Sequence, residues 1–291
     1  MLSLILQQIL NGLLDGVYYL LIALGLSLIF SLGGIINLAH GAFYAIGAYI
    51  TVTISPHVGF GGAVVLSPVA VALLGMLFER FFFRRFYRSD PILSLLLTFG
   101  LAMVAEQLLR MIFGAAPLSY AMPNALRGQI FLGDFIYPYY RTLLFVVAAA
   151  CVIAIWLLLN RTAFGRIVRA GVQNPDMVGA LGISLQPYMS AVAGLGIGLA
   201  GLAGVMLAPI YSVHPAMGQE ILVPAFVVVV IGGLGSFRGV IVAALLVGLV
   251  KGLAVAVGWG QFSTAMIYLL MLLVLLFRPR GLFGERIARF E

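Results

Sequence analysis

The chain has 291 residues, of which 63% are hydrophobic and only 9% are charged. Soluble domains carry about 25% charged residues, so an ordinary soluble protein is excluded. No Asp, Glu, Lys or Arg lies between Gly16 and Phe78. As a helix this stretch measures about 95 Å, which is enough for two or three crossings of a hydrocarbon core of about 30 Å. Because its apolar runs lack the alternation of a β-barrel, the sequence predicts an all-α, polytopic transmembrane helical bundle.

The net charge of +7 predicts a membrane topology rather than a nucleic-acid partner. Eleven of the 16 basic residues fall in three clusters between apolar runs, and basic loops favour the cytoplasmic side. The clusters are Arg80, Arg84, Arg85 and Arg88, then Arg161, Arg166 and Arg169, and finally Arg278, Arg280, Arg286 and Arg289.

Candidate membrane segments follow from the apolar runs and these clusters. If the second segment is a broken or re-entrant element, there are eight spans and the amino terminus is inside, which we favour; if it crosses fully, there are nine and the amino terminus is outside. The stretch 114–141 is then an external loop. The segments are roughly 5–30, 35–54, 62–79, 91–113, 142–160, 188–208, 221–236, 239–258 and 261–278.

Two glycine-rich interruptions resemble each other and predict glycine-broken helices. Each has an aliphatic run, a glycine pair, polar residues and a second run of small residues. Corresponding breaks in two halves point to a transporter built from repeats, with unwound backbone near its pathway; whether these short matches reflect a repeat stays open. The glycines are Gly33, Gly34 and Gly41 in the first break, and Gly232, Gly233 and Gly235 in the second.

The stretch 160–187 is the longest segment in the second half that is too polar for a bilayer, and its arginines place it on the cytoplasmic side. Asn174 is a good helix cap, and Pro175 and Asp176 suit the first helical turn. Met177, Ala180 and Leu181 then form a small apolar stripe, and Gly182 is a natural stop. The pattern predicts a short amphipathic helix on the cytoplasmic face.

Three polar residues inside apolar runs are candidates for a translocation pathway. Asn37 and His40 lie three residues apart beside the first break, and Thr98 lies in a later run. They either line a polar pathway or bond the backbone that the break frees, or a neighbouring helix; the residues leave both open.

Two other charged positions in the apolar runs have local explanations. Glu106 and Arg110 have the spacing of an ion pair along one helix. We expect Lys251 to extend to the outer interface.

Glycines at 194, 196, 198, 201 and 204 predict close helix packing, either within the chain or across a dimer. No P-loop, zinc-protease or nucleophile-elbow motif occurs, and the three histidines are too scattered for a local metal motif. No enzymatic or metal site is therefore expected.

Several stretches together resemble the inner-membrane permease subunits of ABC importers for branched-chain amino acids. They cover nearly the whole chain: Asn11-Gly12, Ala23 to Leu26, Ile36 to Phe43, Asp90-Pro91, Leu97 to Leu101, Thr162 to Gly165, Arg169-Ala170, Asp176, Gly182-Ile183, Gly232 to Ser236, and Arg278 to Gly284. Relatives that handle urea, short amides or aromatic acids share these signals, so the resemblance does not fix the substrate.

The resemblance implies a single permease domain over 1–291 in a bacterial inner membrane, with 160–187 as its coupling loop. Partners would be membrane lipid, a homologous second permease, two cytoplasmic ABC ATPases that bind ATP and Mg²⁺, and a periplasmic binding protein. The chain itself would hold no cofactor and no nucleic acid. The helix near Asn174 to Gly182 would seat in an ATPase groove, where Arg166 or Arg169 would pair with acidic groups.

The rival functional classes are a self-sufficient secondary transporter or channel, which needs intramembrane carboxylates, and a membrane enzyme.

Overall fold

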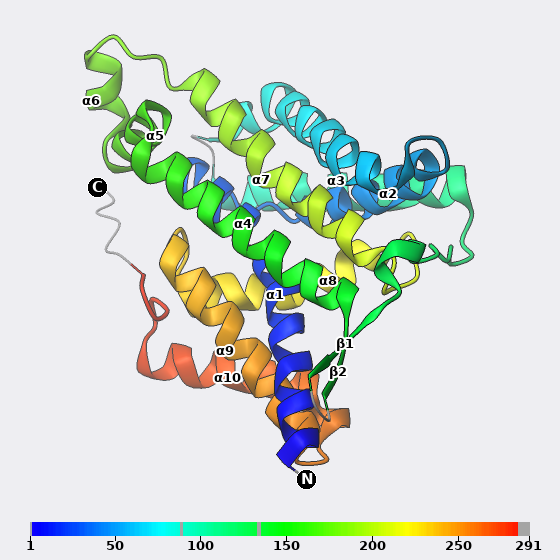
Figure 1. Ribbon diagram of the computed structural model, residues 1–291. Helices are drawn as coiled ribbons and strands as arrows, with labels where there is room; N and C mark the ends of the chain where they lie inside the picture. The colour runs from blue at the N-terminus through cyan, green and yellow to red at the C-terminus, as the bar shows by residue number, and fades with distance from the viewer. Residues whose placement is uncertain (1, 88–89, 133–134, 285–291) are drawn as a thin grey trace.

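The computed structural model describes residues 2–87, 90–132 and 135–284, and it confirms the predicted helical bundle (Figure 1). A short antiparallel hairpin, β1 (Gln129–Leu132) and β2 (Phe135–Pro138), precedes α4. The helices are α1 (Leu2–Gly33), α2 (His40–Phe81), α3 (Pro91–Phe113), α4 (Tyr139–Arg161), α5 (Ala163–Gln173), α6 (Pro175–Ala180), α7 (Gln186–Leu207), α8 (Met217–Gly232), α9 (Phe237–Ala256) and α10 (Ser263–Phe277), with 3-10 turns η1 (Phe83–Arg85), η2 (Asn124–Leu126) and η3 (Gly260–Phe262).

Helix α2 is a hairpin of two limbs rather than one rod. Gly59 has φ +70° and ψ 171°, a backbone conformation that glycine adopts readily and other residues avoid. Across the turn, the Thr51 hydroxyl donates to Ser67 Oγ at 3.1 Å, and the Phe43 and Phe78 rings lie 5.4 Å apart. The limbs therefore run antiparallel in contact, and they correspond to the predicted segments 35–54 and 62–79.

Helix α7 packs closely against both α1 and α2. A Cβ built on Gly204 would lie 2.1 Å from the Tyr44 carbonyl oxygen, and one on Gly25 would lie 2.2 Å from that of Gly196. Gly12 and Gly248 bring α1 and α9 together in the same way. The predicted close packing of the glycine-rich segment is thus confirmed, within this chain.

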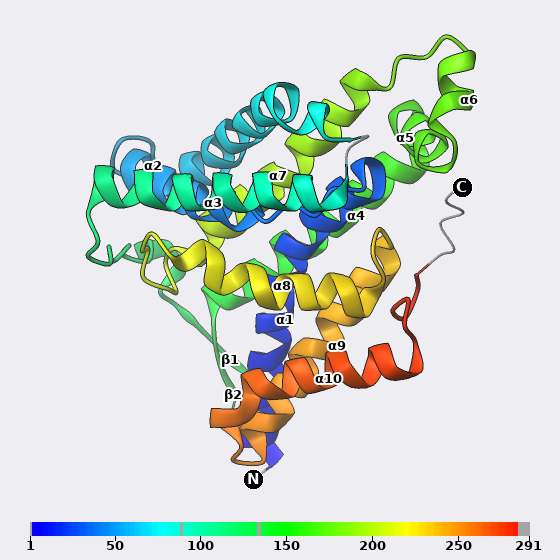
Figure 2. The same cartoon turned by 180° about the vertical axis from the view of Figure 1, so that it is seen from behind.

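The basic segments gather at one end of the bundle. Arg84 contacts the start of α7 through Ser190, and a Cβ on Gly33 would meet the Tyr87 ring. Gly235 lies against Ser31, and Gly233 against Arg280. Helices α5 and α6 lie at the upper left of Figure 1 and the amino terminus at the bottom, and Figure 2 agrees from behind. Arg88, Arg286 and Arg289 lie outside the described residues.

This arrangement favours the alternative in which the amino terminus lies opposite the basic clusters. Seven described helices are long and apolar enough to cross a membrane. One of these is the α2 hairpin with its two limbs, and the shorter apolar helix α8 adds one more. The described helices thus supply nine apolar segments, with α1 ending at the basic end.

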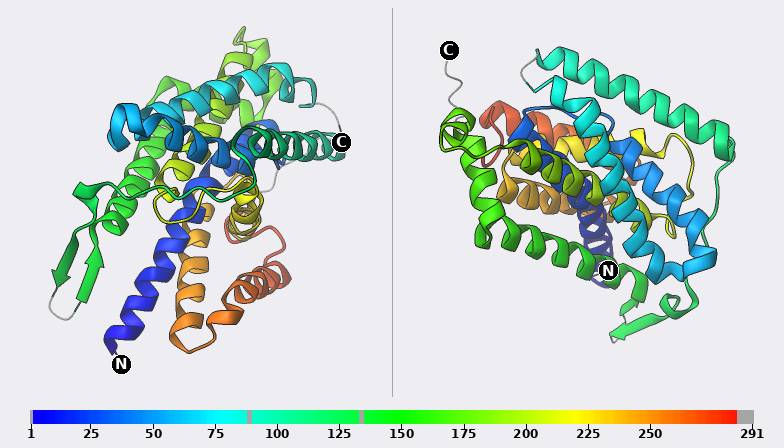
Figure 3. Two further views of the ribbon diagram at one scale, coloured as in Figure 1. Left: turned by 90° about the vertical axis from the view of Figure 1, so that its right-hand side faces the viewer. Right: turned by 90° about the horizontal axis from the view of Figure 1, so that it is seen from above.

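The end that we expect to be external carries the β-hairpin, which projects from the bundle (Figure 3). Leu118 and Val213 form an isolated antiparallel bridge, which joins the loop after α3 to the loop after α7. The Tyr140 hydroxyl donates to the Met206 carbonyl at 2.6 Å. Burial raises the pKa of Tyr137 at the hairpin's end to about 12, so this hydroxyl stays protonated at neutral pH. The sequence had predicted only a loop here.

A cysteine-accessibility experiment tests the topology. In a Cys151→Ala background, which removes the single native cysteine, Val172→Cys on α5 should resist a membrane-impermeant maleimide in intact cells. Ala121→Cys on the opposite side should react, because both positions are exposed and only the membrane separates them. Labelling of Val172→Cys before permeabilisation would contradict the assignment.

Candidate functional site

The first glycine break places Asn37, His40 and Thr98 in one buried region. Helix α1 ends at Gly33, Gly34 has φ +64°, and α2 begins only at His40. All three polar side chains are fully buried. The break therefore carries non-helical backbone into the interior, where its polar groups need partners.

Thr98 supplies partners for that backbone. Its hydroxyl accepts the Leu38 N–H at 3.2 Å and lies 3.2 Å from the Ile36 carbonyl and 3.1 Å from the Leu95 carbonyl. One side chain of α3 thus bridges the residues on both sides of Asn37. For Thr98 the contacts match the structural alternative, in which the polar residue bonds the freed backbone.

Asn37 and His40 are only partly explained by such contacts. His40 Nε2 lies 3.1 Å from the Ile22 carbonyl of α1, as the neighbouring-helix alternative expected. His40 Nδ1 and both amide atoms of Asn37 are buried and have no hydrogen-bond partner among the residues that the structure describes. Since an unpaired buried polar group costs about 1–3 kcal/mol, these three atoms need an explanation beyond packing.

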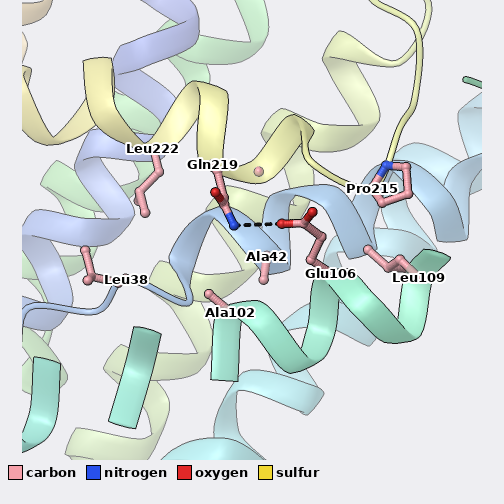
Figure 4. Close-up of a pocket in the computed structure, with 9 residues that line it drawn as sticks. Leu38, Ala42, Ala102, Glu106, Leu109, Pro215, Gln219 and Leu222 are labelled. Atoms are coloured by element: carbon pink, nitrogen blue, oxygen red, sulfur yellow. Dashed lines mark hydrogen bonds between the residues drawn. The ribbon is translucent and has the colours of Figure 1, made fainter. Parts of the chain in front are cut away.

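A pocket adjoins this break (Figure 4). Near its centre, the Gln219 side-chain amide donates to Glu106 Oε2 at 2.7 Å, while Arg110 pairs with Glu106 Oε1 at 3.0 Å. The expected Glu106–Arg110 pair is thus confirmed, and Gln219, which the sequence did not single out, ties α3 to α8. The lining residues are Leu38, Ala42, Ala102, Glu106, Leu109, Pro215, Gly218, Gln219 and Leu222.

The second break lies beside the first and is held by the chain's last described segment. Gly232 and Gly233 end α8, and Gly233 has φ +100°. The Ile231 carbonyl accepts the Leu282 N–H at 2.8 Å, and the Gly232 carbonyl accepts the Phe283 N–H at 3.0 Å. Gly41 of the first region packs backbone to backbone against Gly218, so both ends of α8 contact residues of the two breaks.

The 160–187 loop contains the predicted helix. Asn174 Oδ1 accepts the Met177 N–H at 2.9 Å and caps α6, Pro175 is its first residue, and Gly182 has φ +77° just beyond its end. Met177 is 59% exposed and Leu181 72% exposed. The apolar stripe therefore faces outward, away from the bundle.

A second helix, α5, precedes α6 and was not predicted separately. Thr162 caps it by accepting the Gly165 N–H at 3.1 Å. The two arginines proposed for partner contacts, Arg166 and Arg169, are both exposed, and Arg169 also donates to Asn160 Oδ1 at 3.1 Å and to the Leu159 carbonyl. Arg169 therefore holds α5 against the end of α4. Asp176, in the first turn of α6, is exposed.

Two clusters of charged side chains were not predicted from the sequence: a partly buried one at Lys251 and one around the buried Glu79. Lys251 is partly exposed, and its Nζ pairs with Asp15 Oδ2 at 2.8 Å and donates to the Tyr19 hydroxyl at 3.3 Å. Its extension to the outer interface stays a prediction. Glu79 is fully buried among groups from the basic end of the bundle. Asp15 lies 236 residues from Lys251 and Ser190 lies 111 residues from Glu79, so no local spacing could have revealed these two pairs. Arg84 and Tyr87, which also contact Glu79, lie only five and eight residues from it.

Known proteins match this chain along nearly its full length. Residues 8–276 match the family described as branched-chain amino acid transport system / permease component. The high-affinity branched-chain amino acid transport system permease protein BraD of Pseudomonas aeruginosa is 29% identical over 296 residues, or 96% of each chain. The permease protein LivH of Escherichia coli is 27% identical over 300 residues, again 96% of each. The fructose import permease protein FrcC of Rhizobium meliloti is 34% identical over 110 residues, 35% of this chain and 31% of that protein.

Thr98→Val should lower the free energy of unfolding by about 2 kcal/mol, because it leaves the Leu38 N–H and the Ile36 carbonyl unpaired. Thr98→Ser, which keeps the hydroxyl, should lower the free energy of unfolding much less. Thr53→Val is the matched control, since the Thr53 hydroxyl bonds the Tyr49 carbonyl of its own helix. The thermal unfolding midpoint of each variant is measured in detergent. Equal midpoints for Thr98→Val and wild type would contradict the role of Thr98 in pairing the backbone around Asn37.

Proposed function

Because the chain belongs to the family of branched-chain amino acid transport permease components, we propose that it is the membrane-spanning subunit of an ATP-driven importer. Its substrate would be a branched-chain or related amino acid, and its site the bacterial inner membrane. A homologous second permease would complete the pathway, two ABC ATPases would bind ATP and Mg²⁺, and a periplasmic binding protein would deliver the substrate. The near-complete match over residues 8–276 carries this proposal.

The exposed face of α6 supports the assignment of 160–187 as the coupling loop. Met177 and Leu181 present apolar side chains at the cytoplasmic end, where no lipid tail is expected to cover them. A short capped helix with such a face fits a groove on a partner. In this account Arg166 adds charge complementarity, while Arg169 holds the helix pair in place.

The unpaired atoms of Asn37 and His40 support a role in translocation. A polar substrate crossing an apolar interior needs transient hydrogen-bond partners, and groups already bonded within the protein would have to break those bonds first. Asn37 carries a free donor and a free acceptor next to a break and a pocket. Thr98 contributes indirectly, by holding the backbone on both sides of Asn37.

A self-sufficient secondary transporter is the alternative from another class. Such a protein needs a carboxylate that can bind and release an ion. Both oxygens of Glu106 are engaged by Arg110 and Gln219, which disfavours that role.

The substrate class of the proposed importer is less constrained than its transport mechanism, since FrcC is named for fructose and matches part of the chain. Urea, short amides and aromatic acids are the alternative substrates.

Ala180→Trp should weaken docking of the ATPases, because a bulky side chain on the exposed face of α6 would obstruct its groove. We expect ATP-dependent uptake and copurification of ATPase subunits to fall at least about tenfold, the effect of a loss of about 1.4 kcal/mol. Ala121→Trp, also exposed but on the opposite side, is the matched control. Unchanged copurification and uptake in Ala180→Trp would contradict the coupling assignment.

Asn37→Leu should separate transport from stability. It replaces an unpaired buried amide with an apolar group of similar size, so the thermal midpoint should stay equal or rise. Uptake should fall about tenfold or more while the ATPases still copurify. Asn124→Leu, on the exposed turn η2, serves as control. A lowered midpoint with normal uptake per folded molecule would assign Asn37 a purely structural role.

A further inference from the structure

The buried Glu79 side chain lies at the centre of a polar cluster that joins three parts of the chain. Its carboxylate accepts the Tyr87 hydroxyl at 3.1 Å and the Ser190 hydroxyl, and it pairs with Arg84 at 3.5 Å. Arg84 also donates to Ser190 Oγ at 3.0 Å and to Gln186 Oε1 at 3.4 Å. The cluster thus ties the second limb of α2 and the 82–87 segment to the first turns of α7.

The contacts resist separation because the Glu79 side chain has no solvent exposure. A buried carboxylate that loses its partners is strongly destabilised, so the surrounding donors must move together with it. Burial, together with the neighbouring Glu79 carboxylate, raises the pKa of Tyr87. The phenol therefore remains a donor to Glu79 throughout the physiological pH range.

The cluster stands between the cytoplasmic loop and the first glycine break. On one side, Gln186 and Ser190 directly follow the loop that contains α5 and α6. On the other side, the Tyr87 ring covers Gly33, where a built Cβ would lie 2.7 Å from Tyr87 Cε1. Gly33 and Gly34 precede Asn37 by only a few residues in the chain. A displacement of the start of α7 would therefore reach the first break through the side chains of Glu79 and Tyr87.

We propose that Glu79, Tyr87 and Ser190 form a mechanical link that transmits movement of the cytoplasmic loop to the Gly33–Asn37 break. This inference rests on the proposed function, in which ATPases move that loop. The three residues act as positioning residues: none contacts the substrate, and the Tyr87 ring sets where α1 ends and where the backbone toward Asn37 begins.

The test measures uptake per ATP hydrolysed in the complete importer reconstituted in vesicles. Tyr87→Phe keeps the ring against Gly33 and removes only the bond to Glu79. It should lower the uptake-to-hydrolysis ratio about fivefold or more, the range of a typical coupling free energy, with the ATPases bound and hydrolysis retained. Tyr139→Phe, a tyrosine at the opposite end of the bundle, is the matched control and should keep the wild-type ratio.

A double-mutant cycle with Ser190→Ala distinguishes one link from two independent contacts. If both hydroxyls act through Glu79, the double variant should lose little more coupling than the worse single variant. An unchanged ratio in every variant, or uptake and hydrolysis falling together with folded yield, would overturn the link while leaving the importer assignment intact. Absence of ATP-dependent uptake in the wild-type complex would instead overturn the proposed function, and the link with it.

Discussion

The fold depends on how it pairs the backbone groups that its two glycine breaks release inside an apolar bundle. A membrane interior offers no water to an unpaired N–H or C=O, so each break needs a dedicated partner from elsewhere in the chain. Thr98 bridges the backbone around Asn37, and the N–H groups of Leu282 and Phe283 bond the last carbonyls of α8. The second partner explains why an apolar permease carries a glycine- and arginine-containing segment after its last helix: residues 281–283 complete the end of α8.

Close glycine contacts turn these breaks into parts of one rigid frame. Helices α1, α2, α7 and α9 meet backbone to backbone at glycines, Gly25 with Gly196 and Gly12 with Gly248 among them. Packing of this kind leaves little room for local adjustment, so a force applied at one end moves whole helices. The exposed helix α6 lies at the basic end of this frame, and both glycine breaks contact residues at that end. A single displacement at the basic end would therefore act on both glycine breaks.

Local signals predicted the features that local chemistry determines. The Asn174-Pro175-Asp176 start of α6, its stop near Gly182, the Glu106–Arg110 pair and both helix breaks follow from short motifs, and the structure places them as expected. The partners of buried charges were not predictable in this way. Glu79 meets Ser190 across 111 residues of sequence, and Lys251 meets Asp15 across 236 residues, so only the packing of α2 on α7 and of α1 on α9 reveals these pairs. The apolar composition likewise predicted the number of membrane spans to within one. The direction of α1 could be assigned only from its contacts with Tyr87 and α9 in the structure.

Reconstitution in vesicles tests whether this chain works as the membrane subunit of an ATP-driven importer. The tagged chain would be purified gently from its native membrane together with the subunits that accompany it and placed in vesicles with ATP inside, and uptake of radiolabelled leucine would be measured with and without the proposed binding protein. The account predicts two ATPase subunits and a second permease in the complex, and uptake that requires both ATP and the binding protein. A chain that purifies alone and carries leucine without ATP would contradict it.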